Sequence, residues 1–496
     1  MGESVDAVVV GSGPNGMAAA LTLAAEGLEV LVLEGADTPG GGCRTAELTL
    51  PGYQHDLCST AHPLAAASSF FRRFDLGARG VRMVHPEVVF AHPLDGGRAA
   101  IVTRSVAETA AGLGRDRRTY RRLIGPLVRH ADQIADWTFS GQRRPPTNPT
   151  ALAGFGLRGL RSASSVAQRF RSEEARGLFA GVSAHAMRPL TRPPTAGVGL
   201  LLTMLGHAVG WPFVEGGSVR LTEAMVAALE ANGGTLEMGH WVRSLDELPA
   251  AKAVLLDITP RQLLALAGDR VSGRYRRSLE RFRYGAGVCK VDFALSGPVP
   301  WSHPGCRAAG TVHLGGTFEE VARSEADVAA GRHPVFPYVL VGQAGTADAT
   351  RAPQGGQTLW AYCHVPADSD VDMTPHIEAQ IERFAPGFRD LVLAKVHRTA
   401  QELEAHNPNC VGGDIASGSQ DLWQTFFRPA PRWAPYRTPI PDTYLCSAST
   451  TPGPGVHGRC GELAALSALR HTFGIAHPRG RLSPAPEPEA LVIAVG

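Results

Sequence analysis

One short stretch near the N-terminus constrains the fold of this chain most strongly. Residues 5–10 form a β-branched, nearly uncharged run, typical of a strand that is buried on both faces. Gly11, Gly13 and Gly16 follow at once in G-x-G-x-x-G spacing, and residues 14–26 have the Ala/Leu-rich composition of a helix. This order of strand, glycine turn and helix predicts a parallel α/β sheet that binds a dinucleotide.

The residue types match the physical needs of such a turn. Glycines permit the tight turn and let backbone N–H groups approach a pyrophosphate, and the phosphates then sit on the helix start at Pro14 and Asn15. A second predicted strand, residues 30–33, ends in Glu34, whose carboxylate would accept hydrogen bonds from both adenosine ribose hydroxyls. That carboxylate would repel a 2′-phosphate, which disfavours NADP.

Two further glycine-rich segments separate a flavin site from a nicotinamide site. The first comes directly after the ribose position and contains Gly41, Gly42, Cys43, Arg44 and Thr45. A nicotinamide dehydrogenase has no need of this cluster.

The second segment lies some four hundred residues later, at 442–470. There a predicted strand, residues 444–447, leads into an Ala/Leu helix through a small-residue turn. The turn contains Gly453, Gly455, Val456 and Gly458. Its glycines allow close backbone approach, and the helix dipole favours negative charge developing on a reduced flavin.

With these motifs the chain resembles the flavoprotein superfamily of amine oxidases and phytoene desaturases. In that superfamily a GGR-x-x-T-like turn encloses FAD, and here the arginine, Arg44, comes one residue later than in the commonest form. The C-terminal segment resembles the closing flavin motif of phytoene-desaturase-like proteins. The resemblance implies that FAD is the cofactor and that Val242 lies against adenine.

Composition narrows the function classes. A net charge of +2 over 496 residues gives no reason to expect nucleic-acid binding. The eight cysteines form no C-x-x-C pair, which excludes the redox disulfide of disulfide-reductase flavoenzymes and a zinc site. We expect reduced thiols, no bound metal and a cytoplasmic protein, because the N-terminus does not read as a signal peptide.

Two segments bear on membrane contact. Residues 196–214 contain no charged side chain, but four glycines, His207 and Pro212 favour a buried helix lining an apolar cavity over a spanning helix. Residues 152–171 mix apolar and arginine side chains. Such a stretch is compatible with peripheral contact at a membrane surface, and an exposed lid helix is the favoured alternative.

The order of the expected strands and helices along the chain predicts two interleaved domains. The predicted fold class is α/β, with a Rossmann-like FAD-binding domain interleaved with a substrate domain that carries helices and a mixed or antiparallel sheet. We assign residues 1–75, 215–286 and 414–477 to the FAD-binding domain, residues 76–214 and 287–413 to the substrate domain, and residues 478–496 to a loose tail.

The resemblance covers nearly the whole chain and extends to segments 55–71, 205–218, 359–366 and 412–415. These are similar to segments of bacterial phytoene-desaturase-like NAD(P)/FAD-dependent oxidoreductases. That family includes carotenoid isomerases, retinol saturase and the animal pyridine nucleotide-disulphide oxidoreductase domain-containing protein 2. It implies hydride transfer between flavin N5 and a carbon of an apolar, polyene or isoprenoid-like substrate, in a desaturase, saturase or isomerase.

Histidines in the flavin-proximal motifs are the candidate acid/base groups. His62 and His457 are the predicted catalytic residues, since histidine exchanges protons near neutral pH, and His55 and Asp56 are weaker candidates. The alternatives are a structural hydrogen bond from His62 and a turn cap by His457. Asp414 is interpreted mainly as a turn cap.

Two other functions stay open. One is an amine or alcohol oxidase of the same fold, although no clear aromatic cage or substrate-pairing carboxylate supports it. The other is a non-catalytic carrier resembling Rab GDP-dissociation inhibitors, against which the complete glycine motifs and Glu34 argue. No second dinucleotide motif follows a strand, so we expect a small apolar substrate on one side and a diffusible acceptor, oxygen or a quinone, on the other.

Overall fold

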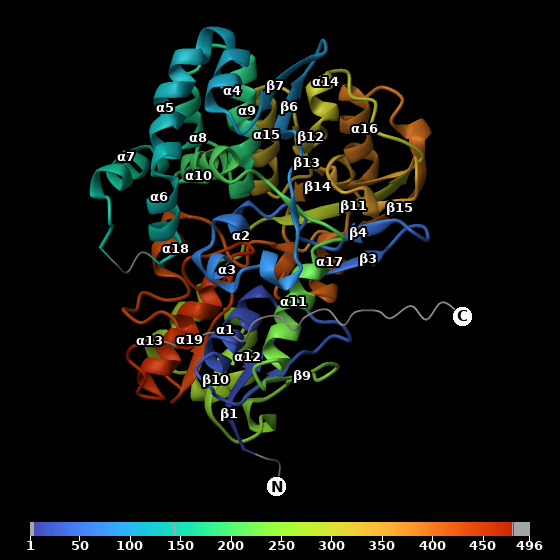
Figure 1. Ribbon diagram of the computed structural model, residues 1–496. Coiled ribbons are helices and arrows are strands. Elements are labelled where there is room, and N and C mark those ends of the chain that lie inside the picture. Colours follow the sequence, from blue (N-terminus) through green and yellow to red (C-terminus); the bar gives the residue numbers. More distant parts are fainter. Residues whose placement is uncertain (1–3, 142–144, 479, 481–496) are drawn as a thin grey trace.

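A five-stranded parallel sheet forms one half of the computed structural model, which describes residues 4–141, 145–478 and 480. The sheet forms the lower part of the molecule in Figure 1. Neighbouring strands are bonded in the order β16 (Thr443–Leu445), β10 (Ala251–Leu256), β1 (Val5–Val10), β2 (Val30–Leu33) and β9 (Thr235–Glu237). Three distant parts of the sequence therefore build one sheet.

Helices cover both faces of this sheet. On one face α1 (Pro14–Ala24), α11 (Val219–Glu230) and α19 (Arg459–His471) pack over side chains such as Ala7 and Val9. Val8, Val10 and Leu256 point to the other face, against α12 (Pro260–Ala267) and α13 (Gly273–Glu280). Burial on both faces explains why the strands read as continuous apolar runs.

The upper half contains a seven-stranded mixed sheet. Its only parallel pair is β12 with β6, and the other neighbours are antiparallel. The order is β15 (Val392–Arg398), β11 (Gly287–Leu295), β14 (Gln357–Val365), β13 (Val339–Gly342), β12 (Ala309–Leu314), β6 (Val88–Leu94) and β7 (Arg98–Val102). Two short ribbons join the halves: β3 (Thr45–Glu47) with β4 (Gln54–Asp56), and β5 (Met83–Val84) with β8 (Phe213–Val214).

The two faces of the mixed sheet differ in chemistry. One face is apolar and packs with α16 (Thr374–Phe384), using side chains such as Val312, Val341 and Ala361. The alternate positions form the other face, where the strand registers place Thr311 level with Trp360. Because successive side chains of a strand point to opposite faces, the sheet has an apolar face against α16 and a partly polar face on the other side. The partly polar face is called the front below.

Most of the remaining helices lie in the upper half of the molecule, around the mixed sheet (Figure 1). They are α2 (Pro63–Ala67), α3 (Ser69–Phe74), α4 (Val106–Gly112), α5 (Arg117–Arg129), α6 (Ala131–Thr138), α7 (Pro149–Gly159), α8 (Ala163–Ala167), α9 (Glu173–Ser183), α10 (Thr195–Ala208), α14 (Pro304–Arg307), α15 (Phe318–Ala329), α17 (Ala400–His406) and α18 (Leu422–Phe427).

The uncharged segment 196–214 supplies most of α10, which is largely buried and lines a cavity, as predicted. Within the ranges that the structure describes, no helix is both long and apolar enough to span a bilayer.

The predicted fold class is confirmed. In the segment 235–245, only Thr235–Glu237 pairs in the sheet. Val242 therefore reaches the site from a loop. The expected loose tail, residues 478–496, lies outside the described residues except for 478 and 480.

Helices α1 and α19 pack against each other at backbone distance. An ideal Cβ built on Gly461 of α19 would lie only 1.7 Å from the carbonyl oxygen of Asn15 in α1. A second glycine contact holds the start of α1, where a Cβ on Gly16 would lie 2.0 Å from the Gly11 carbonyl oxygen. Glycine at both positions lets the two helices and the first strand approach at backbone distance.

We predict that Gly461→Ala destabilises the protein by about 1–3 kcal/mol, because the added methyl group must push α19 away from α1. Thermal or urea unfolding of the purified variant measures this. Gly112→Ala in α4 is the matched control, since its Cβ meets nothing within 4 Å and the residue is helical, so this variant should be neutral or slightly stabilised. Equal stability of the two variants would contradict the assigned packing.

Candidate functional site

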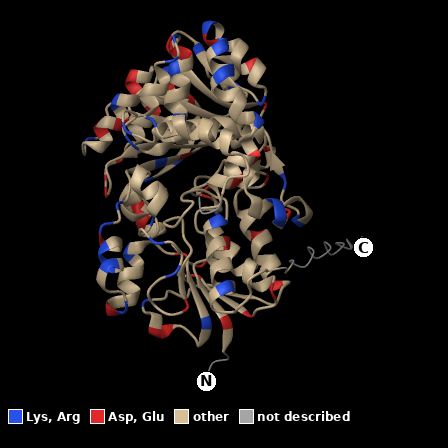
Figure 2. Ribbon diagram, turned by 90° about the vertical axis from the view of Figure 1, so that its left-hand side faces the viewer, with Lys and Arg blue, Asp and Glu red and all other residues tan. Residues whose placement is uncertain are grey.

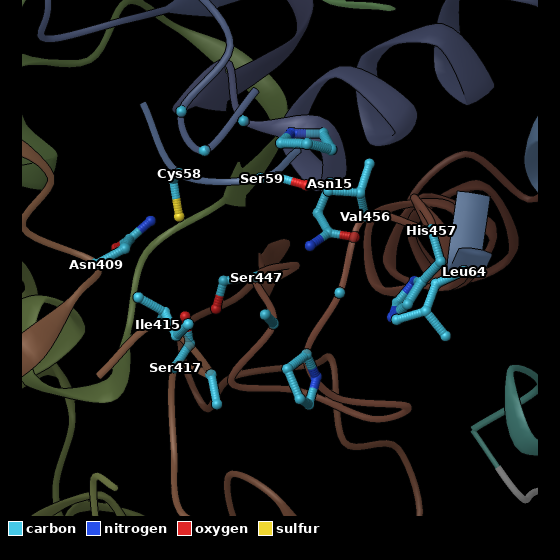
Figure 3. A pocket seen from close by; sticks show the side chains of 18 of the residues that line it. Asn15, Cys58, Ser59, Leu64, Asn409, Ile415, Ser417, Ser447, Val456 and His457 are labelled. Carbon is cyan, nitrogen blue, oxygen red and sulfur yellow. The ribbon is translucent and has the colours of Figure 1, made fainter. Parts of the chain in front are cut away.

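A single cavity of about 1060 Å³ connects the carboxyl edge of the parallel sheet to the front of the mixed sheet. At one end it is lined by Gly11, Gly13 and Glu34, and at the other by His185 and Leu201. Figure 3 shows side chains from several segments, including Asn15, Cys58 and Val456, around part of this space. The predicted N-terminal and C-terminal motifs therefore meet in one place.

Most predicted cofactor residues line the cavity. The lining residues among them are Gly11, Gly13, Pro14, Asn15, Glu34, Gly41, Gly42, Arg44, Val242, Gly455 and Val456.

Five predicted cofactor residues do not line the cavity: Gly16, Cys43, Thr45, Gly453 and Gly458. They support the wall instead. Gly458 leaves room for Phe70 and Ala18, and the Thr45 hydroxyl donates to Asp56 at 2.7 Å. The Cys43 thiol is fully buried, and burial raises its pKa far above the ordinary value, so it is not a nucleophile.

Glu34 is held in place by the glycine turn. Its carboxylate accepts hydrogen bonds from the Ser12 N–H at 2.9 Å, the Ser12 hydroxyl at 2.5 Å and the Ala36 N–H at 2.9 Å. Arg44 lies 3.5 Å away and also donates to the carbonyl oxygens of Thr38 and Pro39. The offset arginine thus folds back on the loop that carries Glu34, the carboxylate expected to bind the ribose.

Asp257 is a site residue that the sequence analysis missed. It follows β10 directly, and its carboxylate accepts the Gly16 N–H at 2.9 Å at the start of α1. Burial, with a smaller contribution from the negative charge of Glu34, raises the pKa of Asp257 to about 7. Its position at the carboxyl end of a parallel strand could have identified it as a site residue, because ligands bind at that edge of such sheets.

The two predicted catalytic histidines have different surroundings. The Nδ1 atom of His457 accepts the Arg459 N–H at 3.0 Å, and its Nε2 atom lies 3.1 Å from the Gly453 carbonyl oxygen. Both ring nitrogens are therefore engaged in the turn before α19, which corresponds to the capping alternative. Burial lowers the pKa of His457 to about 4.

His62 lines the cavity with both ring nitrogens buried and without a hydrogen-bond partner. Burial lowers the pKa of His62 to about 4, so its ring is neutral at pH 7 and offers one donor and one acceptor. A buried group with unmet hydrogen bonds at a cavity wall points to a bound molecule. His62 is thus the stronger of the two predicted acid/base groups.

Asp56, a weaker acid/base candidate, belongs to a buried ion network. It pairs with Arg351 at 3.0 Å and accepts hydrogen bonds from Thr60 and from the Ser218 N–H. Burial alone would raise its pKa, but the Arg351 guanidinium and these hydrogen bonds hold the pKa below the ordinary value. Asp56 therefore stays ionised and joins the two halves.

The remaining candidates have structural partners. His55 lies 2.8 Å from the Thr49 hydroxyl and 3.6 Å from Asp292. Asp414 accepts three backbone N–H groups, from Gly285, Ala416 and Gly418, and so acts as the predicted turn cap.

The sequence analysis also missed a lysine beneath the cavity. Lys290 is buried on the front of the mixed sheet and pairs with Asp292, and its Nζ lies 5.8 Å from the centre of the Trp360 ring. Burial lowers the pKa of Lys290.

The residues at the cavity fit FAD. The Asn15 amide oxygen and both His62 nitrogens are buried without partners, and the Cα of Gly13 would lie 3.0 Å from a Cβ at Gly41. The cradle is therefore shaped for backbone approach to a phosphate, with a ribose acid at one end and unpaired polar atoms further in. Among the described residues, no group of three or more metal-ligating side chains could hold a metal ion.

We predict that FAD binds more weakly as the pH rises through about 7, because Asp257 then becomes negative beside the expected pyrophosphate position. The dissociation constant should be about tenfold lower at pH 6 than at pH 8. Titration of apoprotein with FAD, followed by flavin fluorescence, measures this. Asp257→Asn keeps an acceptor for the Gly16 N–H and should remove most of the dependence; an unchanged pH profile in that variant would refute the assignment.

Comparison with known proteins agrees with this geometry. Residues 9–84 match the model of the NAD(P)-binding Rossmann-like domain. Pyridine nucleotide-disulfide oxidoreductase domain-containing protein 2 of Rattus norvegicus is 24% identical over 94% of this chain and 93% of the relative. The neurosporene-forming phytoene desaturase of Rhodobacter capsulatus is 24% identical, with 91% of each chain covered.

Solved structures share the fold. A putrescine oxidase superposes with a TM-score of 0.62 at 18% identity, covering 95% of this chain and 99% of that one. An oxidoreductase from Methanosarcina mazei gives 0.61 at 17% identity, covering 94% and 100%. With the cofactor cradle described above, these findings show that the chain is similar over nearly its whole length to a phytoene desaturase and has the fold of FAD-dependent oxidoreductases.

Proposed function

We propose that the protein transfers a hydride between FAD and a carbon atom of an apolar, polyene or isoprenoid-like substrate. The observation that carries this proposal is the cavity itself, which continues from the cofactor cradle into a chamber with largely apolar helical walls. Side chains of α7 and α10 form these walls, and they include Leu152, Phe155, Val198, Leu201 and Leu202.

The charges around the cavity also favour a neutral substrate. Of the described residues that line it, the only carboxylates are Glu34 and Asp257, and both lie in the cofactor cradle. An ammonium group entering the chamber would therefore find no ion-pair partner, and its desolvation would not be offset. Amine oxidation is the less favoured chemistry for this reason.

FAD, when bound, supplies the hydride acceptor or donor. The chain's own residues orient the reactants: Glu34 and the start of α1 hold the nucleotide end, and Val456 lies before the N-terminus of α19. The apolar walls exclude water from the reacting carbon. Neutral His62 is placed to hold or move the accompanying proton at one ring nitrogen.

The proposal includes a diffusible second reactant, oxygen or a quinone, which exchanges electrons with the flavin between substrate turnovers. The absence of a second dinucleotide motif in the sequence supports it.

The test is anaerobic reduction of the yellow holoprotein by candidate substrates, followed by loss of flavin absorbance. We expect bleaching by at least one member of a panel of hydrocarbon and oxygenated isoprenoids and none by putrescine. Leu201→Glu should place a charge in the chamber, retain FAD and lose bleaching by at least about tenfold. Bleaching by putrescine alone would instead establish an amine oxidase, and a colourless protein that takes up no FAD would indicate a carrier.

We further propose that α7 brings the cavity to an anionic lipid surface. Leu157 is 74% exposed and does not line the cavity, whereas Leu152, Phe155 and the 48% exposed Leu160 of the same segment do. Arg158 adds positive charge beside the exposed leucines. An exposed apolar helix with cationic flanks suits the interface of a membrane that carries apolar molecules.

Sedimentation with anionic lipid vesicles tests this contact. The variant Leu157→Glu should lose most vesicle binding while keeping its FAD. The matched control is Phe336→Glu, which alters a similarly exposed apolar side chain, 68%, away from α7 and the cavity lining. Vesicle binding that survives in the α7 variant would exclude this surface as the contact.

A further inference from the structure

The floor of the substrate chamber is polar, although its helical walls are apolar. Thr311 on β12 lines the cavity, is only 3% exposed, and its hydroxyl has no hydrogen-bond partner. In register with it, Trp360 on β14 also lines the cavity, and its indole Nε1 is buried without a partner. Unpaired buried donors are costly unless a bound molecule satisfies them.

A pair of imidazoles lies beside this floor. The Nε2 atom of His185 is 2.9 Å from the Nε2 atom of His313, and His185 lines the cavity whereas His313 is fully buried behind it. Two facing Nε2 atoms require that one donates and the other accepts. The position of one proton therefore decides whether His185 offers a hydrogen-bond donor or an acceptor to the chamber.

The surroundings assign that proton to His313. Its Nδ1 atom is buried and has no partner, so an N–H there would be left without an acceptor. We therefore place the proton on Nε2 of His313, which donates to Nε2 of His185. His185 must then carry its own proton on Nδ1, which makes it a hydrogen-bond donor that the pair leaves free.

Local packing makes room for the imidazoles. A Cβ on Gly181 of α9 would lie 2.7 Å from the Cβ of His313, and one on Gly177 would lie 2.9 Å from the ring of His92. These two glycines are one helical turn apart and share a face of α9. The helix therefore presents a flat surface that fits the histidine-bearing strands.

The pair is uncharged at neutral pH. Burial lowers the pKa of His185 to about 3 and holds that of His313 well below its ordinary value. The neighbours of His185 are aromatic, with the Trp211 ring 5.5 Å away. Neutral donors among aromatic rings suit a neutral oxygen acceptor better than an anion, because Lys290, the cation beneath Trp360, is already paired with Asp292 and does not offset the desolvation of a carboxylate.

We propose that the substrate carries a carbonyl or hydroxyl oxygen on its apolar chain, and that His185, Thr311 and Trp360 bind this oxygen at the floor of the chamber. This inference rests on the proposed function and narrows its substrate class to oxygenated isoprenoid-like molecules. His313 is a positioning residue, because it acts only through the tautomer of His185.

The experiment compares farnesal with farnesene, which share a fifteen-carbon isoprenoid chain and differ in the aldehyde oxygen. Binding to the FAD-loaded protein is followed by perturbation of the flavin spectrum and by calorimetry. We expect wild type to bind farnesal at least about fivefold more tightly than farnesene. His185→Leu and the isosteric Thr311→Val should reduce this preference and leave farnesene affinity within about twofold.

The controls separate the subsite from general damage. Thr358→Val removes a hydroxyl from β14 outside the cavity lining and should keep the full preference. Equal wild-type affinity for both compounds would overturn the oxygen subsite and leave the proposed function in place. Binding of neither compound, with FAD retained, would overturn both.

Discussion

The close contact of α1 with α19 is the constraint on which the rest of the structure depends. Gly461 meets the Asn15 carbonyl at backbone distance, so two motifs some four hundred residues apart form one wall of one cavity. A side chain at this crossing would separate the helices and move the turn at Gly455 away from the cradle. The geometry of the flavin end therefore depends on the absence of a side chain at Gly461.

A second interaction joins the cofactor half to the substrate half. Arg351 is fully buried between Asp56 and Asp348, at 3.0 and 2.7 Å, and Asp56 also binds the backbone before α11. Such a network costs desolvation energy, and loss of one partner leaves an unpaired buried charge. It therefore specifies one arrangement of the two halves around the cavity more than it adds stability.

The sequence allowed prediction of the cofactor end because its chemistry is local. A strand, three glycines and Glu34 lie within thirty residues, and their spacing alone implies a phosphate and a ribose. The chamber could not be derived in this way. His185, Thr311 and Trp360 line it from separate elements, and the sequence around each of them does not show that the fold brings them to one cavity.

The parallel sheet also has a consequence for biosynthesis. One of its two edge strands, β16, and the helix that completes the cradle, α19, are the last regular elements described in the chain. The ribosome must therefore release residues up to about the end of α19 before the nucleotide pocket has all its walls. Flavin capture accordingly follows the synthesis of α19, and premature termination upstream of residue 443 yields a chain that lacks one wall of the pocket.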